Sequence, residues 1–125
     1  MTVSIKSLKP YVPAKDFELS KRFYVALGFT LSEGWGGTAD FALNGHAFRL
    51  QNYYVPDWAN NFMMVIGVDD VEAWHQRALE LLNSNAFVGM RVKPPEPVDD
   101  STVLHVVDPT GVLLVFVQQA STVGA

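Results

Sequence analysis

The apolar residues of two stretches fall on one face of a helix. In residues 16–29, Leu19, Phe23 and Leu27 recur at every fourth position, which is the spacing of a buried helix face. Residues 70–82 repeat this pattern with a stripe formed by Val71, Trp74, Ala78, Leu81 and Leu82. Because each stretch follows a short strand pattern, we predict two copies of one unit, in which a strand, a helix and further strands follow each other.

Polar residues mark the ends of these helices. Asp16 can accept a hydrogen bond from the free amides of the first turn, and Gly28 suits the left-handed residue that ends a helix. In the second stretch, Asp69 and Glu72 have the spacing of a capping box. Both helices are therefore predicted to begin directly after acidic residues.

Alternating apolar and polar positions predict the strands. Residues 5–12 alternate, with Leu8, Pro10 and Val12 on one face, and residues 62–68 alternate in the same way. Since prolines cannot donate to a strand ladder, the first strand is expected at an edge. After the second helix, we predict a strand over residues 86–92 and an exposed, proline-rich loop over residues 93–101.

The first predicted hairpin turns at Asn44-Gly45, the preferred pair for a two-residue type I′ turn. This turn pairs Leu43 with His46 and Phe41 with Phe48, which makes one apolar face. The opposite face carries Asp40, Ala42, Ala47, Arg49 and Gln51.

A second hairpin is predicted over residues 102–118, with its turn at residues 108–111. Proline in the second position and glycine in the fourth suit a type I turn followed by a glycine bulge. The bulge places Asp108 opposite Val112, and therefore His105 on the same face as Val115.

The composition limits the possible functions. A chain of 125 residues, 49% of them hydrophobic, is expected to form one domain over residues 1–125. Its net charge of -4 argues against a nucleic-acid partner. No apolar run reaches the roughly 20 residues of a membrane helix, and the chain has neither a signal-peptide pattern nor cysteines. We therefore expect a cytoplasmic protein without a membrane partner.

Three segments resemble one protein family: VPAKDFELSKRFYVALGF, GVDDVEAWHQRALE and VVDPTGVLLVF. In this order they are similar to the vicinal-oxygen-chelate superfamily, which includes glyoxalase I, extradiol dioxygenases and bleomycin-resistance proteins. The resemblance implies an α+β fold of two βαβββ modules whose sheets curve around a cup. The first module would span about residues 1–55 and the second about residues 60–120.

Metal-dependent members of this family hold the ion with a His from the first strand of each module and an acid or His from the last strand. The corresponding residues here are Lys9 and Met63 in the first strands, and Arg49 and Val115 in the last strands. A divalent ion needs several oxygen or nitrogen ligands that carry no positive charge. We therefore expect neither a metal nor another cofactor.

Among the metal-free relatives, the bleomycin-resistance type is the most similar, because residues 48–76 keep its order of strand, Val-Pro-Asp loop, strand and helix. This resemblance implies a protein that sequesters a small organic ligand without catalytic residues, as a homodimer whose cups are shared between chains. The alternative is an enzyme related to glyoxalases or dioxygenases: a lyase, isomerase or oxidoreductase. Such an enzyme would bind a metal if its metal ligands lie at other positions than the four named above. Otherwise it would act without metal through Lys9, Arg49 or His105.

The residues expected to bind the ligand come from both modules and their loops: Lys9, Tyr11, Trp35, Arg49, Gln51, Tyr53, Trp58, Met63, His105 and Val115. Lys9 and Arg49 either hold an anionic group in place of a metal or extend into solvent. His105 is either an acid, base or orienting donor, or a packed strand residue. The loop aromatics either stack on a planar or cationic ligand or cover an interface.

Overall fold

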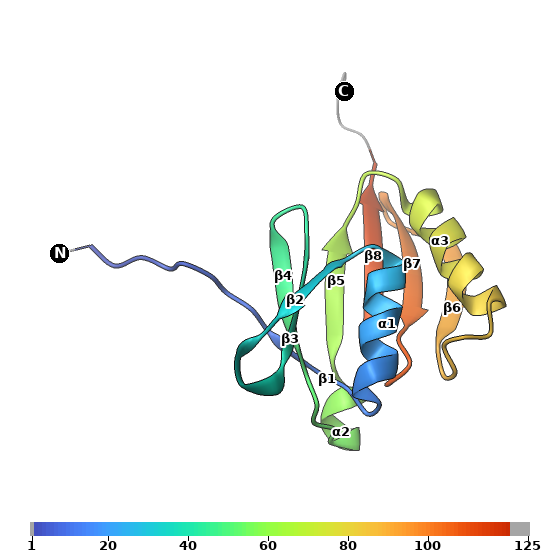
Figure 1. Ribbon diagram of the computed structural model, residues 1–125. Coiled ribbons are helices and arrows are strands. Elements are labelled where there is room, and N and C mark those ends of the chain that lie inside the picture. Colours follow the sequence, from blue (N-terminus) through green and yellow to red (C-terminus); the bar gives the residue numbers. More distant parts are fainter. Residues whose placement is uncertain (1, 121–125) are drawn as a thin grey trace.

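Eight strands form two four-stranded sheets in the computed structural model, which describes residues 2–120 (Figure 1). The first sheet has the order β1-β4-β3-β2, and the second repeats it as β5-β8-β7-β6. In each sheet the first strand runs parallel to the last, and the other pairs are antiparallel. The predicted α+β fold of two βαβββ modules is therefore confirmed.

The strands of the first sheet are β1 (Tyr11–Pro13), β2 (Thr30–Glu33), β3 (Ala39–Leu43) and β4 (His46–Gln51). Those of the second are β5 (Met63–Gly67), β6 (Arg91–Val98), β7 (Ser101–Val107) and β8 (Leu113–Gln119). Both hairpins have the predicted register, because Phe41 pairs with Phe48 and His105 with Val115.

Each module contributes one long helix, α1 (Phe17–Leu27) or α3 (Val71–Asn83). Asp16 caps α1 as predicted, since its carboxylate accepts the Leu19 amide at 3.1 Å, and the helix ends at Gly28 with φ 129°. At α3 the cap is Asp70, which accepts the Ala73 amide at 3.2 Å. The prediction of a cap at Asp69 is wrong, because Asp70 is the residue directly before the helix and its side chain makes the capping hydrogen bond.

Two shorter elements lie in the connections: a 3₁₀ turn over Trp35–Gly37, and α2 (Pro56–Ala59) between the modules. Among residues 2–120, no helix is long and apolar enough to cross a membrane.

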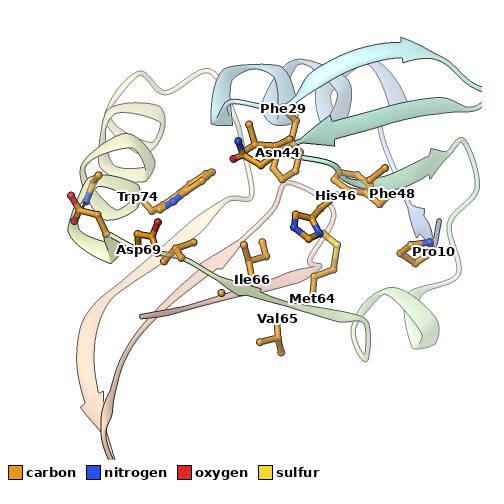
Figure 2. A pocket seen from close by; sticks show the side chains of 16 residues that line it. Pro10, Phe29, Asn44, His46, Phe48, Met64, Val65, Ile66, Asp69 and Trp74 are labelled. Carbon is orange, nitrogen blue, oxygen red and sulfur yellow. Dashed lines mark hydrogen bonds between the residues drawn. The ribbon is translucent and has the colours of Figure 1, made fainter. Parts of the chain in front are cut away.

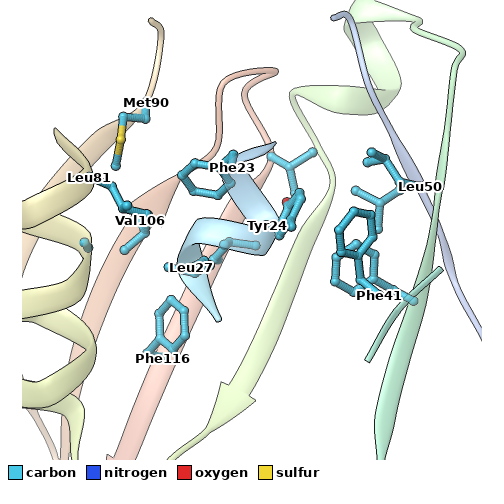
Figure 3. Close-up of a cluster of buried hydrophobic side chains, with 14 of the residues drawn as sticks. Phe23, Tyr24, Leu27, Phe41, Leu50, Leu81, Met90, Val106 and Phe116 are labelled. Carbon is cyan, nitrogen blue, oxygen red and sulfur yellow. The ribbon is translucent and has the colours of Figure 1, made fainter. Parts of the chain in front are cut away.

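Both modules share one hydrophobic core. Phe23, Tyr24 and Leu27 of α1 are at most 1% exposed. They lie between the inner faces of the two sheets, with Phe41 on one side and Phe116 on the other (Figure 3). Helix α3 covers the rest of the second sheet, and Trp74 stacks on Phe116 with the ring centroids 4.8 Å apart. Each sheet therefore has an inner face in the core and an outer face turned away from the helices.

The first strand is shorter than predicted. It covers only Tyr11–Pro13, whereas a strand over residues 5–12 was expected. Residues 2–10 extend away from the body (Figure 1), and Leu8, predicted to face the core, is 82% exposed. Only the last three residues of β4 have β1 as a neighbour, so within residues 2–120 the alternating pattern upstream of Tyr11 has no strand to pair with.

The strand after α3 begins later than predicted. Residues 86–90 form a turn, and β6 covers Arg91–Val98, where an exposed loop was expected. This part of the prediction is wrong because β6 is the edge strand of its sheet, where a proline need not donate to a neighbour. A register shift between Lys93 and Glu96 accommodates the two central prolines.

Candidate functional site

The outer face of the first sheet carries a cluster of charged side chains. Arg49 lies opposite Tyr11 on one side and opposite Asp40 on the other. The Asp40 carboxylate accepts hydrogen bonds from Arg49 Nε at 2.7 Å and Nη2 at 3.0 Å, and from Lys9 Nζ at 2.7 Å. The Arg49 guanidinium also lies 5.8 Å from the centre of the Tyr11 ring. We name Lys9, Asp40 and Arg49 the charged cluster.

These contacts change the ionisation of the cluster. The hydrogen bonds from Arg49, and then from Lys9, lower the pKa of Asp40 to about 2 although the residue is only 7% exposed. The Asp40 carboxylate in turn raises the pKa of Arg49. Both shifts favour the charged forms of Asp40 and Arg49, and with Lys9 the cluster has a formal net charge of +1. Asp40 was placed on this face by the hairpin register, but its role as the partner of both cations was not predicted.

The outer face of the second sheet is mostly apolar. One row of paired residues crosses its four strands and consists of Lys93, His105, Val115 and Val65. In the next row, Met63 lies opposite Leu113. Met63 is 57% exposed and Val65 69% exposed. This face therefore presents apolar side chains along β5 and β8, with His105 on β7 and the cations Lys93 and Arg91 on the edge strand β6.

The surroundings of His105 leave one ring nitrogen without a partner. The side chain is half-buried between Lys93 and Val115, and among residues 2–120 nothing bonds to its Nδ1, which is shielded from solvent. His75 and His46 lie elsewhere: His75 contacts Glu72 at 3.2 Å on α3, and His46 follows the first hairpin turn. His105 is thus the histidine that reaches an outer face.

The remaining predicted residues lie at loops and strand ends. Trp35 and Trp58 are 77% and 65% exposed, and Tyr53 is 49% exposed. The Tyr53 and Trp58 rings lie together, with their centroids 6.2 Å apart, whereas Trp35 belongs to the separate turn between β2 and β3. Gln51 ends β4 opposite Pro13. These aromatics are available at the surface for a ligand or a partner.

The two outer faces lie on opposite sides of the shared core. Within one chain, Lys9, Tyr11 and Arg49 therefore do not meet Met63, His105 and Val115. The positions that the resemblance marks for a metal are Lys9 and Arg49 in the first module and Met63 and Val115 in the second, and the two modules have matching register, since Tyr11 pairs with Arg49 as Val65 pairs with Val115. Within residues 2–120, no three His, Cys, Asp or Glu side chains gather closely enough for a metal. The cationic and apolar side chains at these positions do not fit a divalent ion.

A cavity of about 950 Å³ lies between the two modules. Figure 2 shows Phe48 and His46 of β4 on one side and Met64 and Ile66 of β5 on the other; Val65 also borders the cavity, although its side chain lies on the other side of β5. None of the residues predicted from the sequence to bind the ligand lines this cavity.

Two strand edges border the cavity. Strand β5 is an edge strand along its whole length, and β4 has β1 beside it only over Arg49–Gln51. Pro10, where residues 2–10 leave the sheet, lies at the rim (Figure 2). The cavity therefore lies beside the edge of β5 and the part of β4 that β1 does not cover.

Comparison with known proteins identifies relatives of this fold. The sequence profile described as "Glyoxalase/Bleomycin resistance protein/Dioxygenase superfamily" matches residues 5–116. A bleomycin-binding protein solved in complex with bleomycin superposes with a TM-score of 0.73 at 22% identity, over 92% of this chain and 99% of that chain. TnmS3, an antibiotic-binding protein from Streptomyces, gives 0.73 at 23% identity, over 95% and 100%.

An enzyme has the same fold. Lactoylglutathione lyase from Agrobacterium tumefaciens superposes with a TM-score of 0.65 at 15% identity, over 92% of this chain and 95% of that chain. No curated protein sequence matches.

Proposed function

The chain belongs to the glyoxalase/bleomycin resistance protein/dioxygenase superfamily, and from this premise we propose that it binds and sequesters a small organic molecule. One observation carries the proposal. The outer face of the second sheet is turned away from the helices, and its exposed side chains include Met63 at 57% and Val65 at 69%. An open apolar surface with a few polar groups is typical of a ligand-binding wall.

We propose that a complete site needs a second copy of the chain. The charged cluster and the apolar face lie on opposite sides of the core, so one ligand cannot contact both within a single chain. When the first sheet of one chain adjoins the second sheet of its partner, the two surfaces line one cup. A two-fold dimer repeats this arrangement and has two equivalent cups.

Residues 2–10, which we name the N-terminal arm, can connect the first sheet of one chain to the second sheet of its partner. The arm is extended and projects from the body (Figure 1), and its Val3, Ile5 and Leu8 are 94%, 80% and 82% exposed. An extended segment of this kind adds to an open strand edge through backbone hydrogen bonds. Lys9 and Pro10 are held on the first sheet through Asp40 and Arg49, so residues 2–8 are the part of the arm that can extend to a partner. At roughly 3.3 Å per residue, these residues reach about 23 Å, which exceeds the length of the five-residue β5. We propose that each arm pairs with the partner's β5 and fills the cavity beside it.

The binding proposal can be tested with a thermal-shift screen of small metabolites and glycopeptide drugs. A compound that binds the folded state raises the melting temperature, by an amount that corresponds to about 2.7 kcal/mol at a hundredfold excess over Kd. We expect at least one compound to stabilise the protein and to be recovered unchanged by mass spectrometry. A screen without any stabilising compound would contradict sequestration.

A metal-free enzyme is the second candidate function, and the position of His105 favours it. His105 lies half-buried on the outer face of the second sheet, between Lys93 and Val115, and a histidine at such a surface can move a proton to or from a bound compound. Conversion of a bound compound that His105→Ala abolishes, with its affinity retained, would establish catalysis. Stoichiometric nickel, zinc, manganese or iron in the purified protein would instead indicate a metal-dependent member.

A further inference from the structure

The charged cluster has more hydrogen-bond donors than its carboxylate uses. Arg49 carries five N–H groups and Lys9 three, and three of these bond to Asp40. The remaining donors belong to two cations, and the cluster has a net charge of +1. It can therefore accept one further anionic group.

The side chains of Arg49 and Lys9, which carry these donors, are more exposed to solvent than the carboxylate of the cluster. The Asp40 side chain is only 10% exposed, whereas those of Arg49 and Lys9 are 20% and 28% exposed. Asp40 thus lies beneath the two cations and holds them side by side. A ligand that approaches this face meets N–H donors before it meets the carboxylate.

We infer that the charged cluster binds the acidic group of an amphipathic organic acid, a singly charged carboxylate or sulfonate on an apolar body. This inference rests on the proposed function, because it names the class of ligand for the same cup. A single negative charge neutralises the cluster, whereas a doubly charged phosphate leaves one negative charge without a partner beside Asp40. Arg49 and Lys9 provide charge-assisted hydrogen bonds, which are stronger than neutral ones.

The rest of the cup suits the apolar body of such an acid. In the proposed dimer, the charged cluster of one chain adjoins the partner's Met63 and the partner's Val65. Tyr11 lies beside the Arg49 guanidinium and offers a ring to the same space. The acidic group and the apolar body of the ligand therefore have separate walls.

Dansylglycine and dansylglycinamide test this preference, because they share a fluorescent aromatic body and differ in one carboxylate. Fluorescence titration of the full-length protein should give a Kd for dansylglycine at least tenfold below that for dansylglycinamide. Arg49→Gln and Lys9→Met each reduce the charge of the cluster from +1 to zero. In both variants the ratio of the two Kd values should fall below threefold, mainly through weaker binding of the acid.

Lys21→Met is the matched control. Lys21 bonds to Glu18 at 3.1 Å and is 25% exposed, like Lys9, but it lies on α1. This variant should keep the ratio of the wild-type protein, and melting temperatures show that each variant is folded. Equal binding of acid and amide to the wild-type protein would overturn the preference and leave the binding function standing. Binding of neither probe, together with a screen that finds no stabilising compound, would overturn both.

Discussion

The Tyr24 hydroxyl donates a 2.6 Å hydrogen bond to the Asp108 carboxylate, and both side chains are fully buried. Tyr24 belongs to α1 of the first module, and Asp108 to the β7–β8 turn of the second. The other carboxylate oxygen accepts the backbone amides of Thr110, Gly111 and Val112 at 2.8, 2.9 and 2.9 Å. The Asp108 side chain therefore fixes the β7–β8 turn and bonds the second module to the first.

Tyr24→Phe should destabilise the protein, because it leaves one buried oxygen of Asp108 without its donor. The expected loss in the free energy of unfolding is about 1–3 kcal/mol, measured by urea denaturation. Tyr53→Phe is the control, since Tyr53 is 49% exposed, and its free energy of unfolding should stay within about 0.5 kcal/mol of the wild-type value. Equal stability of Tyr24→Phe and wild-type protein would show that the bond contributes nothing.

The charged cluster should make stability depend on pH. The pKa of Asp40 is about 2 in the folded state and about 3.9 in an unfolded chain. A carboxyl with a lowered pKa stabilises the fold fully above its unfolded pKa, and this contribution is lost as the pH falls from about 4 to 2.

Asp40→Asn removes this contribution and should cost about 1–2 kcal/mol at neutral pH, less than the shift itself implies because both cations are partly exposed to solvent. The difference between Asp40→Asn and wild-type protein, measured by urea denaturation, should shrink between pH 7 and pH 3. A difference that stays constant across this range would refute the assigned pKa.

The N-terminal arm should control the oligomeric state. Ile5→Asp and Leu8→Asp place a charge at exposed apolar positions of the arm, and each should weaken the dimer at least tenfold. Ser7→Asp adds the same charge at a polar position and should leave the dimer intact. Size-exclusion chromatography with light scattering, over a dilution series from tens of micromolar, measures the effect. A wild-type protein that is monomeric at the highest concentration would rule out the dimer.

Local turn chemistry was the most informative signal in the sequence. The Asn44-Gly45 turn determines which residues of β3 and β4 face each other, and the same count places Asp40 opposite Arg49. The ion pair between them could therefore have been found from the sequence by extending the register by one pair. The turn at residues 108–111 likewise located His105 beside Val115 correctly.

The wrong secondary-structure predictions concern strands whose neighbours in the sheet the sequence does not identify. Residues 5–12 alternate as a strand does, but alternation states only that a segment suits a sheet, and in the part of the chain that the structure describes the segment upstream of Tyr11 has no adjacent strand. The prolines of β6 predict a loop from sequence alone, but their effect depends on whether a strand is central or at an edge of its sheet. The placement of the predicted site residues on two separate sheets was equally hidden, since the alternating pattern does not say how the outer faces of the two sheets are oriented.

Two neighbouring residues of β5 distinguish the outer face from the core. Val65 is 69% exposed on the outer face, whereas Ile66 packs against the core. Val65→Gln should change the free energy of unfolding by less than about 0.5 kcal/mol, yet weaken a ligand found in the screen at least fivefold, because it places a polar group in the apolar wall. Ile66→Gln should cost about 1–2 kcal/mol, because Ile66 is partly buried and loses apolar contact with the core. Urea denaturation and ligand titration separate the two effects, and a Val65→Gln variant with unchanged affinity would remove the outer face of the second sheet from the binding site.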